Sequence, residues 1–336
     1  MAVKKRAEVI TVLNGLKCIL TPNEVLEQSN AFVFKDKKIF TFNGEIFASA
    51  DYDIGIKQPF SIVGADFLKL LEKFPDDQIG IDLDGNELVL TGKRKKAGIT
   101  IFKEILLPYT EVPEPGKLFK VSENFFHYLF QCAQICGRDH TNPKTTHVHV
   151  RKNFIEATDR YRVFRVDVTT KFIKREIMIP SDSILLLGNK TIKKAGIKDN
   201  WLHLLSENGI RYSLRCSEIE YFDDEMLHSI LNIDGVSGSF PKTISDTIER
   251  AQVVQDQLGE AHITLKENAL KIRTEKDGVW YEEKRSIKYS GKSISFTVSL
   301  NFLKEILSKT KKVIFGESSI KIEKDNFHFV ICVEKK

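Results

Sequence analysis

A phrase of similar residues occurs three times in this chain at nearly equal spacing. Each copy has the pattern of a short strand running into a short amphipathic helix. The copies cover residues 59–74, 177–190 and 295–307. If Phe67, Ile184 and Phe302 are taken as equivalent positions, the copies lie 117 and 118 residues apart in a chain of 336. A period of that length, filling the chain, predicts three copies of one domain rather than a solenoid of small units.

Two stretches rich in Pro, Gly and Ser separate the copies. They lie at residues 113–116 and 234–241, where the composition predicts linkers. We therefore predict three domains with the boundaries 1–115, 116–238 and 239–336. Each domain has an ordinary size, and 42% hydrophobic with 29% charged residues is typical of a soluble globular protein.

Within each third, the pattern is a helix, hairpins, the repeated phrase and further hairpins. The expected first helices are 7–20, 121–136 and 244–258, by their apolar spacing. Expected hairpins lie at 31–44 and 78–90, the second around a tight turn at 84–86. Further strands are expected at 147–150, 154–155, 201–205, 210–214, 262–265, 270–273, 312–315, 320–323 and 327–333. The fold class is therefore α+β, with two helices packed on antiparallel sheets in each of three repeated domains.

Charge, hydropathy and cysteine content indicate the cellular compartment in which the chain is expected. A formal net charge of +5 is mild and does not by itself indicate a nucleic-acid binder. No apolar run reaches the roughly 18 residues of a membrane span, and no secretory signal follows the basic start. The five cysteines are scattered, which favours free thiols in a reducing cytoplasm.

One motif in the middle third resembles a known family. Residues 154–163 read Phe-Ile-Glu-Ala-Thr-Asp-Arg-Tyr-Arg-Val, similar to the Ala-Thr-Asp-Gly-His-Arg-Leu signature of bacterial DNA sliding clamps, the DNA polymerase III beta subunits. The Phe-Pro pair at 240–241 and the Tyr-Ser-Gly segment at 289–298 resemble the same family. The resemblance is strong over 118–336 and rests mainly on pattern over 1–115. The short chain and its diverged first third would suit a phage-encoded or mobile-element clamp.

This resemblance implies a ring of two identical three-domain subunits joined head to tail. Such a ring encircles duplex DNA and tethers a DNA polymerase, so it is a processivity factor and not an enzyme. It implies no cofactor. Loading would need an ATP-dependent clamp loader, because the chain has no nucleotide-binding loop of its own.

A sliding ring should attract phosphates through solvated cations without reading bases. The alternative is that each lysine only solvates a helix face. We expect the DNA-facing cations on or beside the helices of all three repeats. They are Lys4, Lys5, Arg6, Lys17, Lys69, Lys73, Lys190, Lys193, Lys194, Arg250, Lys304, Lys309, Lys311 and Lys312.

The resemblance also implies a groove for partner peptides between the second and third domains. Its residues are Thr158, Tyr161, Arg162, Val163, Pro241, Leu300 or Phe302, Val330, Ile331, Cys332 and Val333. Apolar walls suit a Leu or Phe of a peptide, and Arg162 would hold its backbone or a Gln side chain. The chain departs from the family at Arg160, Tyr161 and the C-terminal residues 332–336, so its peptide preference should differ. The alternative is that Thr158 and Asp159 only shape a hairpin.

Other acidic, histidine and cysteine groups could suggest chemistry but form no convincing catalytic set. Paired carboxylates can hold Mg²⁺ for nucleases, although acidic residues beside tight turns are commoner. The alternatives to a clamp are a metal-dependent nucleic-acid enzyme and a monomeric clamp-fold adaptor. The groups concerned are Asp51 with Asp53, Asp82 with Asp84, His147 and His149 with Asp139 and His140, and Cys132 with Cys136.

Overall fold

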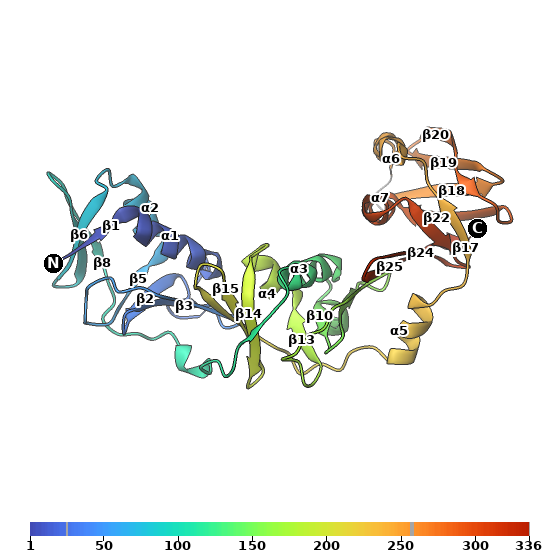
Figure 1. Cartoon of the computed structure of the whole chain (residues 1–336). Coiled ribbons are helices and arrows are strands. Elements are labelled where there is room, and N and C mark those ends of the chain that lie inside the picture. The colour runs from blue at the N-terminus through green and yellow to red at the C-terminus, as the bar shows by residue number, and fades with distance from the viewer. Residues whose placement is uncertain (25, 256–258, 336) are drawn as a thin grey trace. The chain divides into compact units, whose positions relative to one another are not determined.

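The computed structural model describes residues 1–24, 26–255 and 259–335 (Figure 1). They form two compact units. The first unit is Met1–Phe130 with Thr170–Glu218, and the second is Gln131–Thr169 with Ile219–Lys336. The expected boundaries after residues 115 and 238 fall inside these units, so the division into three domains stays a prediction. Among the described residues, no helix is long and apolar enough to cross a membrane.

The first unit holds two antiparallel sheets and the helices that pack on them. Its sheets have the strand orders β1-β6-β7-β8 and β5-β2-β3-β4-β16-β15-β14-β9. Its helices are α1 (Arg6–Leu16), α2 (Gly64–Lys73) and α4 (Ser181–Leu187), with 3₁₀ turns η1 (Lys17–Ile19) and η2 (Tyr109–Glu111). Its strands are β1 (Ala2–Lys5), β2 (Ala31–Lys35), β3 (Lys38–Phe42), β4 (Ile46–Asp51), β5 (Phe60–Val63), β6 (Gln78–Asp84), β7 (Glu87–Thr91), β8 (Lys96–Thr100), β9 (Phe119–Lys120), β13 (Ile177–Pro180), β14 (Ile192–Lys198), β15 (Trp201–Ser206) and β16 (Arg211–Arg215).

The second unit is built in the same way. Its strands follow the orders β10-β11-β12-β25-β24-β23-β17-β21 and β20-β19-β18-β22-β26. Its helices are α5 (Asp224–Leu231), α6 (Ile244–Gln252) and α7 (Leu300–Lys309), with η3 (Pro143–Thr145); α3 (Phe125–Ile135) has residues in both units. Its strands are β10 (His147–Val150), β11 (Phe154–Thr158), β12 (Arg162–Asp167), β17 (Val236–Ser239), β18 (Glu260–Lys266), β19 (Ala269–Lys276), β20 (Val279–Ser286), β21 (Lys288–Tyr289), β22 (Ile294–Ser299), β23 (Lys312–Phe315), β24 (Ser319–Lys324), β25 (Phe327–Cys332) and β26 (Glu334–Lys335).

The repeated phrase forms the same structure each time, which confirms the α+β prediction. Strand and helix follow one another without a loop at β5–α2, β13–α4 and β22–α7. The fourth residue of each helix is Phe67, Ile184 and Leu303, and all three are fully buried. Leu303, and not Phe302, is therefore the equivalent position in the third copy.

Several elements differ from the expectation. Helix α5 was not among the expected helices. It begins after Asp223, whose carboxylate accepts hydrogen bonds from the backbone N–H groups of Glu225 and Met226. Part of the expected linker forms β17, and β20 was not expected. Helix α6 ends at Gln252, and residues 256–258 of the longer helix expected there lie outside the described residues.

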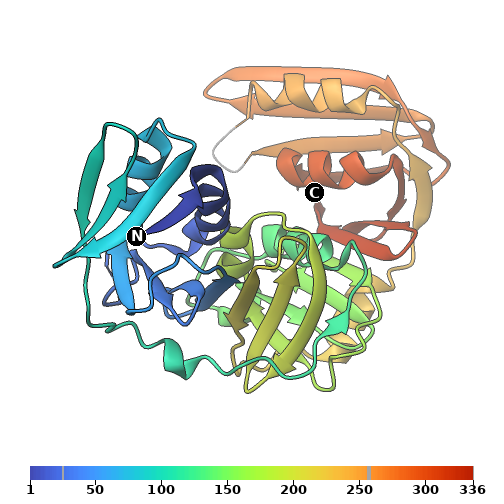
Figure 2. The ribbon, with the colours of Figure 1, turned by 60° about the vertical axis from the view of Figure 1, so that its left-hand side comes forward.

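In each unit, strands from neighbouring repeats pair edge to edge. We call the β4–β16 pairing the first joint; it places Phe47 opposite Ser213 and Ala48 opposite Tyr212. The β12–β25 pairing is the second joint, and it places Val163 opposite Val330. One side of each joint faces helices: the Tyr212 hydroxyl donates to the Gly15 carbonyl of α1, and α7 contacts β25. Figure 2 shows these helices beside their sheets in a second view.

The side of the first joint away from α1 is filled by the chain that leads out of the first repeat. Leu107 and Val112 of that segment are buried, and Tyr109 packs beside them. They cover an aromatic cluster in which Phe40, Phe42, Phe47 and Trp201 are at most 5% exposed. Burial of this much apolar surface makes the first joint a closed core.

Candidate functional site

The second joint ends in a tight turn that carries the sequence motif. The Asp159 carboxylate accepts hydrogen bonds from the N–H groups of Tyr161 (3.0 Å) and Arg162 (2.9 Å), while the Thr158 hydroxyl accepts one from the N–H of Arg160 (3.1 Å). Arg160 lies in the left-handed region at φ +80°, which strongly favours glycine. The turn therefore explains why a glycine suits this position in the signature that the chain resembles.

Beside this turn, the side of the second joint away from α7 holds an apolar pocket of about 270 Å³. Strands β12 and β25 form its floor, and α5 forms a wall that the sequence did not reveal. Its lining is Thr158, Arg160, Arg162, Val163, Phe222, Met226, Leu227, Ile230, Val330 and Cys332. The apolar walls and modest size fit one or two aliphatic or aromatic side chains of a peptide.

Arg162 is held in place at the rim of the pocket. Its Nε donates to the Asp159 carboxylate at 2.8 Å, and its Nη1 is paired with Glu305 of α7. The guanidinium also lies 4.4 Å from the centre of the Phe302 ring. Burial raises the pKa of Glu305 in spite of the Arg162 charge beside it. Since two of its nitrogens are occupied, Arg162 offers a peptide mainly its remaining edge and its aliphatic stem.

Of the expected groove residues, the structure gathers Thr158, Arg162, Val163, Val330 and Cys332 in the pocket. Tyr161 is 63% exposed on the turn, so it lies outside the lining. Leu300 and Ile331 are fully buried within the unit and cannot line an open surface. Phe302 lies behind Arg162, and Val333 borders a separate, smaller cavity.

Pro241 does not line the pocket either. It lies just before α6, and its carbonyl accepts the first hydrogen bond of that helix, from the Ile244 N–H. The wall expected from Pro241 is supplied instead by α5, through Met226, Leu227 and Ile230. These residues lie three, four and seven positions after the capping Asp223, a helix signal that was present in the sequence but not recognised.

No family model matches the chain, and no curated protein matches it. Solved structures do. The DNA polymerase III subunit beta from Pseudomonas aeruginosa is similar with a TM-score of 0.82 over 99% of both chains at 12% identity. A sliding clamp from the same organism bound to griselimycin has a TM-score of 0.83 at 13% identity over 99% of both chains. A putative DNA polymerase III beta subunit from Eubacterium rectale gives 0.85 at 16% identity over 98% of both chains.

The chain has the sliding-clamp fold. The likeness extends over almost the whole length, so it includes the first third, where the sequence resemblance was weakest. The α+β clamp fold expected from the repeat and from the 154–163 motif is thereby confirmed.

On this clamp fold, the expected DNA-facing cations lie on helices, on strands and in the segments between them. Helices α1, α2, α6 and α7 carry six of them: Arg6, Lys69, Lys73, Arg250, Lys304 and Lys309. Helices α3 and α4 contain no Lys or Arg, so the cations expected in the middle repeat lie after α4 or on β14. Lys4 and Lys5 lie on β1, Lys17 in η1, Lys190 after α4, Lys193 and Lys194 on β14, Lys311 after α7, and Lys312 on β23.

Several of these cations are engaged within the protein. Arg6 donates to the carbonyls of Leu71 and Glu72 near the end of α2. Lys311 donates to the carbonyl of Leu307, close to the end of α7, at 2.8 Å. Surface ion pairs join Lys5 to Glu8, Lys193 to Glu207 and Lys304 to Glu249. Exposed pairs of this kind are weak, so they leave these lysines able to exchange partners.

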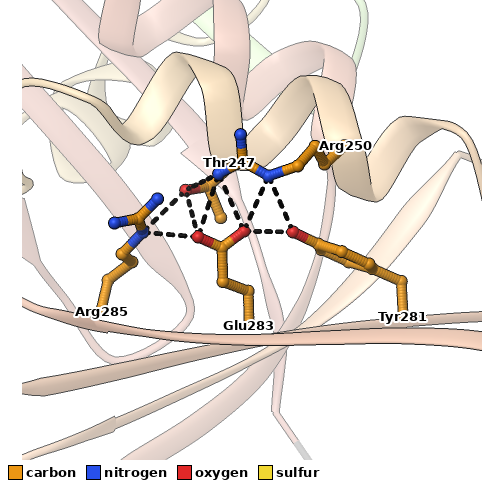
Figure 3. Close-up of polar contacts among 5 residues, drawn as sticks. All are labelled: Thr247, Arg250, Tyr281, Glu283 and Arg285. Atoms are coloured by element: carbon orange, nitrogen blue, oxygen red, sulfur yellow. Dashed lines mark hydrogen bonds and ion pairs between the residues drawn. The ribbon is translucent and has the colours of Figure 1, made fainter.

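Arg250 is the most strongly engaged of the set (Figure 3). From α6 it reaches over β20, where its guanidinium donates to both Glu283 oxygens at 3.0 to 3.1 Å and to the Tyr281 hydroxyl. Burial alone would raise the pKa of Glu283, but hydrogen bonds from Tyr281 and Arg250, with the charge of Arg285, hold it below its usual value. Arg250 therefore secures α6 to the edge strand β20, and less of its charge is available to phosphate.

Several of the groups considered for metal chemistry have local partners. Asp53 pairs with Lys37 at 3.3 Å, Asp82 with the N-terminal amine at 3.2 Å and Asp84 with Lys96 at 3.9 Å. Buried His149 is bonded to buried Glu156 at 2.8 Å. Cys132 is also buried, which raises the pKa of its thiol well above the usual value. Asp53, Asp82, Asp84 and His149 are thus engaged by other groups of the protein.

Proposed function

We propose that this protein is a DNA sliding clamp, a processivity factor that encircles duplex DNA and tethers a DNA polymerase without catalysing a reaction. The observation that carries the proposal is the clamp fold, matched over 98–99% of the chain. All five cysteines are free, which suits a reducing cytoplasm. An ATP-dependent clamp loader would open the ring.

The joints themselves support assembly into a ring. Twice in one chain, equivalent strands of successive repeats pair edge to edge, β4 with β16 and β12 with β25. The next strands in this series are β20 of the last repeat and β8 of the first. Within the described residues, each of them has a strand neighbour on one side only. Pairing β20 of one subunit with β8 of the next would repeat the joint head to tail and close a homodimer.

Exposed apolar residues on β20 support its burial in such a contact. Val279 and Trp280 are 59% and 58% exposed, which is unusual for large side chains on an unpaired edge strand. The exposed lysines on α2 and α7 would then face phosphates without base contacts, as sliding requires. The apolar pocket of the second joint would receive short peptide segments of the polymerase and of other partners.

Mass and DNA retention test this proposal. Light scattering should give twice the chain mass of 38.4 kDa, and nicked circular DNA should retain the loaded protein longer than linear DNA. Val279→Glu should place a charge in the β20 contact and yield monomers. Val3→Glu, an equally exposed valine on the edge strand β1, is the matched control and should stay dimeric. Equal loss from circular and linear DNA would refute the clamp.

A further inference from the structure

A row of cross-strand neighbours leads from the apolar pocket to a second hollow on the same sheet of the second unit. Val330 of the pocket is paired with Lys321 on β24, Lys321 with Ile314 on β23, and Ile314 with Ser237 on β17. Neighbouring strands lie about 4.8 Å apart, so the row covers about 14 Å. An extended peptide of about four residues would span that distance.

Both openings lie on one side of this sheet. On β23, Val313 and Phe315 point into the core, where Phe315 packs against Phe240, Tyr289 and Phe296. Side chains alternate along a strand, so Lys312 and Ile314 point to the opposite side. The pocket residue Val330 likewise points opposite to the buried Phe329, which packs on Phe164.

The second hollow is larger and positively charged. Its volume is about 400 Å³. Its charged lining residues are three lysines, Lys288, Lys312 and Lys321, and one glutamate, Glu323. Glu323 is already bonded to Lys321 at 2.6 Å and to His328 at 2.9 Å. Lys288 and Lys312 are exposed and have no ion-pair partner among the described residues. The hollow therefore carries uncompensated positive charge, and the Ser237 and Ser239 hydroxyls add hydrogen-bond donors.

We propose that this hollow, the lysine hollow, receives acidic side chains of the same partner peptide whose apolar residues fill the pocket. The inference deepens the proposed function and rests on it for the pocket. The short distance between the two openings on one side of the sheet favours a peptide, and the excess of lysines favours Asp and Glu in its flank. Lys312, expected from the sequence to face DNA, is assigned to a protein partner instead.

Binding of synthetic peptides tests the assignment. The probes are fluorescein-labelled Leu-Ala-Leu-Phe-Gly-Asp-Glu-Asp and its amide counterpart Leu-Ala-Leu-Phe-Gly-Asn-Gln-Asn, with a second pair in which the polar flank comes first. Fluorescence anisotropy at low salt should show the acidic member of one pair binding about tenfold more tightly than its amide, since several exposed ion pairs add. The advantage should shrink at high salt.

Matched variants locate the effect. Lys288→Gln with Lys312→Gln should abolish the acidic advantage and leave the amide peptide unaffected. Lys266→Gln with Lys276→Gln removes the same charge from another sheet of this unit and should preserve the advantage. Equal binding of acidic and amide peptides would overturn the lysine hollow and leave the pocket standing. Failure of every peptide to bind, or binding that Ile230→Trp does not weaken, would refute the pocket and the inference together. If the first pair of variants weakens binding of a 20-base-pair duplex and acidic peptides have no advantage, the hollow binds phosphates instead.

Discussion

The two joints of this molecule are built from equivalent strands, yet one is closed and the other open. In the first joint, Leu107 and Val112 of the segment leaving the first repeat complete an aromatic core. In the second joint, the segment leaving the second repeat forms α5, which stands beside the strands and leaves about 270 Å³ free. The same sheet geometry thus gives a structural contact in one place and a binding site in the other, according to what the connecting segment supplies.

The largest effect on stability should come from a substitution that leaves a cavity in the closed joint. Leu107→Ala should lower the free energy of unfolding by about 2–5 kcal/mol, because it leaves a cavity among packed aromatic rings. Met226→Ala in the open joint should change it by no more than about 0.5 kcal/mol, because Met226 is 43% exposed. Urea unfolding followed by the fluorescence of buried Trp201 measures the loss in Leu107→Ala. Urea unfolding followed by circular dichroism measures the change in both variants. Equal losses would show that the two joints are packed alike.

The second-largest effect should be a loss of folding stability in acid, caused by a buried histidine beside the closed joint. His203 on β15 is fully buried beside Ser213, and burial with the nearby Arg211 charge lowers its pKa to about 4 from 6.5. The unfolded chain therefore binds the proton more readily between these values. Stability contributed by neutral His203 is complete above pH 6.5 and is lost as the pH falls toward 4, by roughly 3 kcal/mol.

The control for this pH effect is His203→Gln, which cannot titrate. Thermal unfolding from pH 7 to pH 4 should show a shallower loss in His203→Gln than in the unsubstituted protein. Parallel pH profiles would show that His203 does not cause the sensitivity of the first unit.

A larger side chain in the pocket of the open joint should weaken peptide binding while changing the stability of the fold little. Ile230→Trp adds an aromatic ring to the pocket wall and should weaken binding of a Leu-Phe peptide at least about tenfold, or about 1.4 kcal/mol. The unfolding midpoint should change little, because the added ring occupies open space. Anisotropy titration and thermal unfolding on one preparation separate the two effects. Undiminished peptide binding would move the partner site elsewhere.

The smallest effect concerns the turn at the pocket rim. Arg160→Gly should stabilise the protein by about 1 kcal/mol, because glycine adopts φ +80° without steric cost. Arg160→Ala is the control: it removes the same long side chain but keeps the Cβ atom, so it should not stabilise. If Ala and Gly raise the unfolding midpoint equally, the gain comes from the lost side chain and not from the backbone.

Much of the fold was predictable, because apolar periodicity and tight-turn residues act locally. The strand–helix phrase and the hairpin at 84–86 form as expected, and the strand expected at 327–333 is β25 of the second joint. Helix α5 was not foreseen, because its signal, a capping Asp223 before three apolar residues, spans only about two turns, and its contact with β25 is not visible in the sequence.

The site was less predictable than the fold. Whether a lysine lies on a helix or a strand, and which carboxylate it meets, depends on contacts between distant residues. Arg162 and Arg250 were expected to meet ligands, yet each is bound by a glutamate from another element, Glu305 and Glu283. Pro241 was assigned to the pocket by its place in the sequence, while the wall came from residues 226–230.

The edge-to-edge joints have a consequence for how such a molecule can evolve. Each repeat completes its neighbour's sheet, so a repeat excised at the expected boundaries would leave a bare strand on both itself and the remainder. A single repeat of this kind therefore cannot be exchanged independently of its neighbours. A substitute repeat must bring two compatible strand edges at once, so the edges of the three repeats are constrained to change together.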